Sequence, residues 1–163
     1  MTSEKISVFW FRRDLRLEDN IALARALESG YPVLAVFIFD TQIIDELAVD
    51  DARISFIYKQ LHKIHMQLVA RKSSLHLFKG DPLLVWKKVL GTYEIEEVYA
   101  NKDYEPYALK RDMEVEELLR SHGIPFHRFK DQVIFEEDEI VKNDGKPYTV
   151  FTPYKRKWLE KFQ

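Results

Sequence analysis

The chain has 163 residues, of which 46% are hydrophobic, a size and composition that allow one compact domain with its own apolar core. Its 25 lysines and arginines against 27 aspartates and glutamates give a net charge of -2, which argues against a main nucleic-acid surface, because phosphate binding usually leaves a basic footprint. No cysteine is present, which excludes disulfides and thiolate ligands, and no apolar stretch resembles a signal-peptide core or a membrane span. We therefore expect a cytoplasmic, soluble monomer without a membrane partner.

Five strand-like apolar runs alternate with helical patterns along the whole chain. The runs lie at residues 6–11, 33–39, 74–78, 97–100 and 125–129, and no internal repeat or linker separates them. Such βαβ alternation predicts an α/β fold, a Rossmann-like, doubly wound, five-stranded parallel sheet with helices on both faces. We expect one domain over residues 1–163.

Helix signals agree with this arrangement. Asn20 is a good N-cap for the helix after the first strand, and Asp81-Pro82 places an N-cap before a proline at the first helical position. After Asp50, apolar residues at positions 54, 57, 61, 64 and 68 recur every three or four residues and form one stripe of a long helix. Near the end, Thr152-Pro153 predicts the start of a last helix, whose aromatic stripe either covers the sheet or faces a partner.

The loop after the first strand is crowded with charge. It carries Arg12, Arg13, Asp14, Arg16, Glu18 and Asp19 between an apolar strand and a helix. In open α/β sheets ligands bind at this edge, but a solvated cluster of ion pairs has the same composition. Both interpretations stay open from the spacing alone.

Several chemistries have no support in the sequence. Neither a Gly-x-Gly-x-x-Gly motif nor a Gly-x-x-x-x-Gly-Lys-Ser/Thr motif occurs, so a dinucleotide or P-loop phosphate cradle is not expected. His62 and His65 lie one helical turn apart, but no carboxylate stands at ligand spacing, so we expect no metal site. No serine lies in a nucleophile elbow, and we expect no catalytic residue in this chain.

Four carboxylates follow strands of the predicted sheet. Asp14 follows the first strand, Asp40 the second, and Asp103 and Glu105 the fourth. Because parallel strands end at the same edge, these side chains should converge on one crevice. A crevice rich in carboxylates repels phosphates and suits a polar heterocycle with N–H and O–H donors. The alternative is that these residues only form turns and cap helices.

Three segments resemble the DNA photolyase and cryptochrome family. Residues 9–20, Phe-Trp-Phe-Arg-Arg-Asp-Leu-Arg-Leu-Glu-Asp-Asn, are similar to the opening of the family's amino-terminal domain. Residues 104–112 resemble its helix after the fourth strand, and residues 148–158 the segment that closes its first domain. The three segments occur in family order and together span nearly the whole chain.

The resemblance implies a light-harvesting antenna chromophore at this edge. In the methenyltetrahydrofolate type an Asn-Glu pair stands where this chain has Tyr107-Ala108, so that chromophore is possible but not favoured. For the favoured deazaflavin or flavin type, the positions that correspond to cofactor-binding residues are Asp14, Phe37, Asp40, Arg53, Asp103 and Glu105. Two of these have alternatives, since Phe37 also suits the core of the second strand and Arg53 also suits an ion pair with Asp50 or Asp51.

The resemblance further implies the work of a longer protein. A helical FAD-binding domain is expected to follow this chain, and the whole protein is expected to be a deoxyribodipyrimidine photolyase, a lyase that uses light to repair cyclobutane pyrimidine dimers in damaged DNA. The chain alone should then lack lyase activity. The alternatives are the same domain of a cryptochrome photoreceptor and a stand-alone nucleotide-binding α/β module.

Overall fold

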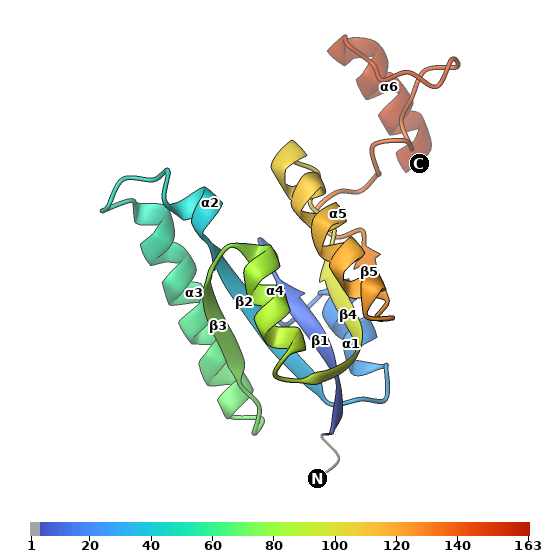
Figure 1. Cartoon of the computed structure of the whole chain (residues 1–163). Coiled ribbons are helices and arrows are strands. Elements are labelled where there is room, and N and C mark those ends of the chain that lie inside the picture. The colour runs from blue at the N-terminus through green and yellow to red at the C-terminus, as the bar shows by residue number, and fades with distance from the viewer. Residues whose placement is uncertain (1–3) are drawn as a thin grey trace. The chain divides into compact units, whose positions relative to one another are not determined.

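The computed structural model describes residues 4–163 and divides into two compact units. The first unit ends at Asp131 and the second covers residues 132–163. The first is built on five parallel strands in the order β3-β2-β1-β4-β5 (Figure 1). The strands are β1 (Lys5–Phe11), β2 (Val33–Asp40), β3 (Leu75–Gly80), β4 (Glu94–Asn101) and β5 (Phe126–Phe129).

The prediction of five parallel strands is confirmed, although each strand differs from its predicted bounds by at least one residue, and β3 and β4 differ most. β3 begins one residue later and ends two residues later than the apolar run that predicted it. β4 begins at Glu94, three residues before the predicted start, because its first residues alternate polar side chains with the buried Ile95. An apolar run therefore marks the buried part of this strand and misses its half-exposed beginning.

Each helix of the first unit begins at a polar or acidic N-cap. The helices are α1 (Ile21–Leu27), α2 (Thr41–Ile44), α3 (Ala52–Val69), α4 (Pro82–Leu90) and α5 (Pro106–Ser121). The side chains of Asn20 and Asp81 accept hydrogen bonds from the backbone N–H of Leu23 and Leu84, as the sequence predicts for α1 and α4. Asp40 and Asp51 cap α2 and α3 in the same way.

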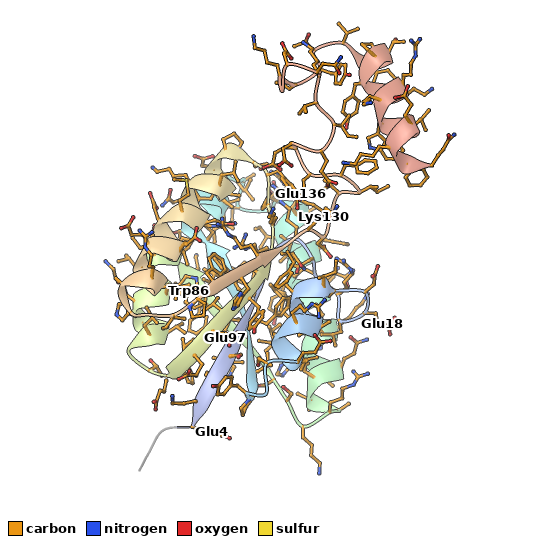
Figure 2. All side chains as sticks on the ribbon, turned by 90° about the vertical axis from the view of Figure 1, so that its right-hand side faces the viewer. Glu4, Glu18, Trp86, Glu97, Lys130 and Glu136 are labelled. Carbon is orange, nitrogen blue, oxygen red and sulfur yellow. The ribbon has the colours of Figure 1, made fainter. Side chains whose placement is uncertain are left out.

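Two apolar cores lie on opposite faces of the sheet, which confirms the doubly wound arrangement. Alternation along β1 sends Val8 and Trp10 into the core with α4 and α5, and Phe9 and Phe11 into the core with α1 and α3. Figure 2, which looks at the sheet from the β5 side, shows these two helix layers, with Trp86 on the side of α4 and α5. The carboxyl ends of β1, β2 and β4 therefore reach the same edge of the sheet, between the two helix layers.

The second unit contains α6 (Phe151–Phe162) and a short bridge between Val141 and Pro147. The ring of Trp158 meets Phe135 edge-on at 5.3 Å and stacks on Phe162 at 4.9 Å. The predicted start of this helix at Thr152-Pro153 is wrong, because the helix begins at Phe151. A proline is accepted anywhere in the first turn, where backbone N–H groups have no partner within the helix.

Among residues 4–163, no helix is long and apolar enough to cross a membrane.

Candidate functional site

A cavity of about 210 Å³ opens at the carboxyl edge of β1 and β2. Its apolar wall comes from the strands, from α2 and α3 and from the start of α4 and includes Trp10, Phe11, Phe37, Ile38, Phe39, Ile43, Ile44, Ile57 and Pro82. Its polar wall comes from the segments after β1, β2 and β4 and from α5 and includes Arg12, Arg13, Asp40, Asp103, Glu105, Tyr107 and Arg111. The topology thus gathers an apolar slot and six charged side chains at the edge where open α/β sheets bind ligands.

Four of the six predicted cofactor-binding residues line this cavity. They are Phe37, Asp40, Asp103 and Glu105. Phe37 is also part of the core with α1 and α3, so it faces the cavity from a position fixed by packing. Its 7% exposure fits both the binding role and the core role.

Asp14 lies at the same edge but is not among the residues that line the cavity. Its carboxylate accepts hydrogen bonds from the backbone N–H of Arg12 at 2.8 Å and from Asn101 Nδ2 at 2.6 Å. Asn20 Nδ2 donates a third bond to it at 3.2 Å. In this structure Asp14 therefore ties β1, β4 and the start of α1 together.

Arg53 lies on the first turn of α3 and does not line the cavity. Its guanidinium binds Asp51, with Nη2 at 2.7 Å and Nε at 2.9 Å from the carboxylate oxygens. This is one of the two ion pairs that the alternative interpretation expected. The pair also lowers the pKa of Asp51 to about 2, chiefly through the side-chain hydrogen bond from Arg53.

The carboxylates that line the cavity already have protein partners. Asp40 accepts a bond from Tyr107 Oη at 2.5 Å, and its other oxygen caps α2 through the N–H of Gln42. Burial, and then the hydrogen bond to Asp40, raise the pKa of the Tyr107 hydroxyl well above its usual range. Tyr107 is thus held as a neutral donor, and Asp40 keeps lone pairs for a further donor.

Arg13 bridges the other two carboxylates of the cavity. Its Nη2 lies 2.7 Å from Glu105 Oε2 and its Nε lies 3.3 Å from Asp103 Oδ2. The pKa of Arg13 is raised, first by its hydrogen bond to Glu105. Because 57% of the Arg13 side chain is exposed, this bridge is weak and can rearrange around a ligand.

A buried charge cluster lies beside the cavity and was missed by the sequence reasoning. The Asp112 carboxylate accepts from Arg12 Nη1 at 2.6 Å and from Arg111 Nη2 at 3.1 Å. Burial lowers the pKa of Arg12 to about 10, and its Nε and Nη2 have no hydrogen-bond partner in the described chain. The signal was present, since Asp112 shares one helical stripe with the buried Ala108, Val115 and Leu119, where a carboxylate needs a partner.

A doubly wound parallel sheet with a part-apolar cavity at its carboxyl edge defines an α/β domain with a candidate ligand site at that edge. Residues 7–163 match the family model of DNA photolyase, and the chain belongs to the DNA photolyase family.

Three relatives illustrate this membership. The chain is 34% identical over 151 residues to a deoxyribodipyrimidine photo-lyase of Synechococcus sp., covering 93% of this chain and 31% of that protein. It is 34% identical over 164 residues to Cryptochrome-2 of Arabidopsis thaliana, covering 98% of this chain and 26% of that protein. A solved archaeal photolyase from Sulfolobus tokodaii, described as having two FAD molecules with the implication of a novel light-harvesting cofactor, superposes with a TM-score of 0.73 at 28% identity. That superposition covers 83% of this chain and 32% of the archaeal one, so the chain spans about a third or less of these relatives.

Proposed function

We propose that this chain is the antenna domain of a deoxyribodipyrimidine photolyase and that its carboxyl-edge cavity holds a flavin or deazaflavin chromophore. The observation that carries the proposal is the pairing of a slot of aromatic and isoleucine side chains with carboxylates at its rim. A tricyclic ring of this class presents flat apolar faces, and its ring and ribityl edge carries donors and acceptors. The protein would supply a rigid binding site that excludes water, and the chromophore would absorb the light.

The chemistry of the cavity fits such a ring. Phe37 and Ile57 offer apolar surface, while Asp40 and Asp103 offer acceptors, and Arg111 reaches the cavity as a donor. The cavity volume of about 210 Å³ lies below the range of about 300–1,000 Å³ that is common for drug-sized ligands. The ring system would therefore fill the slot, and the ribityl chain would extend toward the exposed Arg13 and Glu105.

The folate type of antenna fits these residues less well. Where the family's folate pocket has an Asn-Glu pair, Tyr107 donates its hydroxyl to Asp40 and Ala108 is 3% exposed. Neither side chain can replace the amide and carboxylate of that pair. The Sulfolobus tokodaii photolyase, described as having two FAD molecules with the implication of a novel light-harvesting cofactor, supports a flavin in a related fold.

For the whole protein we propose repair of pyrimidine dimers in damaged DNA, with FAD bound by a further domain. The similarity to the Synechococcus photo-lyase supports this activity. The similarity to Cryptochrome-2 at the same identity supports a second candidate, in which the same antenna domain belongs to a blue-light photoreceptor. The antenna role of the cavity is common to both.

Equilibrium titration tests the cavity itself. Riboflavin and an 8-hydroxy-5-deazaflavin are expected to bind and methenyltetrahydrofolate is not, as followed by fluorescence anisotropy of each chromophore. Asp103→Ala removes an acceptor that is 6% exposed and should weaken flavin binding about tenfold or more, since a buried donor left unpaired costs about 1–3 kcal/mol.

The matched control removes a carboxylate at the other end of the fold. The control is Glu28→Ala. Glu28 follows the carboxyl end of α1, which runs back from the cavity edge, and its side chain forms an ion pair with Arg25. This variant should bind riboflavin as the unmodified chain does. Equal losses for Asp103→Ala and Glu28→Ala would place the flavin outside this cavity, and binding of methenyltetrahydrofolate alone would overturn the proposed chromophore class.

A further inference from the structure

Trp10 is the aromatic side chain of β1 that carries two cations against its ring. It lines the cavity, and the guanidinium carbon of Arg12 lies 4.4 Å from its ring centroid. The guanidinium carbon of Arg111 lies 5.1 Å from the same ring. A second indole, Trp86, meets Trp10 edge-on at 5.5 Å.

The charge cluster beside this indole is buried. Arg12, Arg111 and Asp112 keep 6%, 10% and 1% of their side chains exposed, so water screens them little. Asp112 binds both guanidinium groups and Asp14 adds a further negative charge near Arg12, but the guanidinium groups are the charges that lie against the Trp10 ring. Two nitrogens of Arg12, Nε and Nη2, are also buried and have no hydrogen-bond partner among residues 4–163, which costs free energy in the folded chain.

An indole beside an excited flavin quenches the excited state by electron transfer. One electron passes from the indole to the excited flavin, so the indole is oxidised to a radical cation and the flavin is reduced by one electron. The electron then returns, and the excitation is lost as heat instead of reaching a second chromophore. A positive charge next to the indole opposes the first step, because it repels the radical cation.

We infer that Arg12 and Arg111 protect a chromophore bound in this cavity from electron-transfer quenching by Trp10. The inference rests on the proposed flavin-type occupant and assigns to the two arginines a role besides holding the fold. At about 5 Å and an effective dielectric constant of about 20, loss of one charge makes the radical cation about a hundredfold or more easier to form. Since only part of this change reaches the rate, we expect about a tenfold shorter excited-state lifetime of the bound flavin.

Charge and packing are separated by two variants at one position. In the chain loaded with riboflavin, Arg111→Gln removes the charge and should shorten the fluorescence lifetime of the bound fraction about tenfold. Arg111→Lys keeps a positive charge and should retain most of the lifetime. Adding Trp10→Phe to Arg111→Gln removes the electron donor and should restore the long lifetime.

Two lifetime results would overturn the inference. One is an unchanged lifetime for bound riboflavin in Arg111→Gln. The other is a short lifetime that persists after Trp10→Phe, because the quencher would then be a different group. Circular dichroism spectra that match the unmodified chain establish that each variant is folded.

A second measurement needs no bound flavin and keeps the inference separate from the proposed function. The chain has three tryptophans, and Trp158→Phe removes the one in the second unit. In that background, flash oxidation by a soluble ruthenium photosensitiser, with an added sacrificial electron acceptor that oxidises the excited sensitiser, should give a several-fold higher yield of tryptophan radical for Arg111→Gln than for Arg111→Lys. Trp10→Phe should abolish the excess.

If riboflavin does not bind, the proposed occupant is wrong, and the radical yields alone decide whether the arginines protect Trp10. Equal yields of tryptophan radical in Arg111→Gln and Arg111→Lys would overturn the inference that the arginines protect Trp10.

Discussion

Asp112→Asn should destabilise the first unit strongly, because it removes the carboxylate of the buried charge cluster. The carboxylate is 1% exposed and holds Arg12 and Arg111 through oxygen–nitrogen distances of 2.6 and 3.1 Å. Asparagine keeps the shape but removes the charge and turns an N–H group toward a guanidinium. Two buried cations then lack a counter-charge, and breaking a buried pair in this way costs about 3–5 kcal/mol.

Urea unfolding followed by circular dichroism measures this loss. A domain of this size has a total stability of about 5–15 kcal/mol, so the variant should lose a large share of it. With a slope of about 2 kcal/mol per molar urea, the unfolding midpoint should fall by about 2 M. The matched control is Glu117→Gln, which breaks an arginine–carboxylate pair with Arg120 on the exposed face of α5 and should cost no more than about 1 kcal/mol.

Because Arg111 and Asp112 form one buried pair, we also expect Asp112→Asn and Arg111→Gln to be energetically coupled. Arg111→Gln should cost less in the Asp112→Asn background than alone, because there it removes an uncompensated charge. A loss below about 1 kcal/mol for Asp112→Asn, or strict additivity with Arg111→Gln, would refute the view that this carboxylate compensates buried cations.

Two further predictions concern polar groups of the sheet. Burial and a hydrogen bond to Glu97 raise the pKa of Tyr99 to about 12, whereas the unfolded chain ionises near pH 10, so this group's stabilisation is complete below about pH 10 and is lost as pH rises toward 12. The difference in free energy of unfolding between the unmodified chain and Tyr99→Phe, measured in urea, should therefore shrink between about pH 10 and pH 12. A difference that stays constant over this range would contradict the raised pKa of Tyr99. Asn101 donates to Asp14 at 2.6 Å and to Asn20 at 2.9 Å, so Asn101→Ala should cost about 3 kcal/mol and speed hydrogen exchange in α1, whereas a loss below about 1 kcal/mol would show that the network adds little.

The fold was predictable because its signals are local. Strands buried on both faces are continuous apolar runs, and the caps Asn20 and Asp81 act within three residues of their own positions. The alternation of strands and helices then allows few topologies, since parallel crossovers are right-handed and short. The start of β4 was missed because a half-exposed strand end has no apolar run.

The site was predictable only as far as strand ends determine it. The edge of the sheet placed Asp40, Asp103 and Glu105 around one cavity, but the direction in which each side chain turns depends on distant partners. Asp14 turns toward Asn101, which lies 87 positions away in the chain, and no local pattern encodes that contact. Arg53 instead binds Asp51, two residues before it, which is the local alternative that the sequence also offered.

Energy transfer to FAD tests the antenna assignment most directly. The chain, joined to the FAD-binding domain that the proposal assigns to the whole protein, is reconstituted with riboflavin, an 8-hydroxy-5-deazaflavin or methenyltetrahydrofolate, and the excitation spectrum of light-driven dimer repair is recorded. We predict that the absorption band of the flavin or deazaflavin appears in that spectrum and that Asp103→Ala weakens it. Efficient transfer from methenyltetrahydrofolate, with no binding of flavin or deazaflavin, would contradict this prediction.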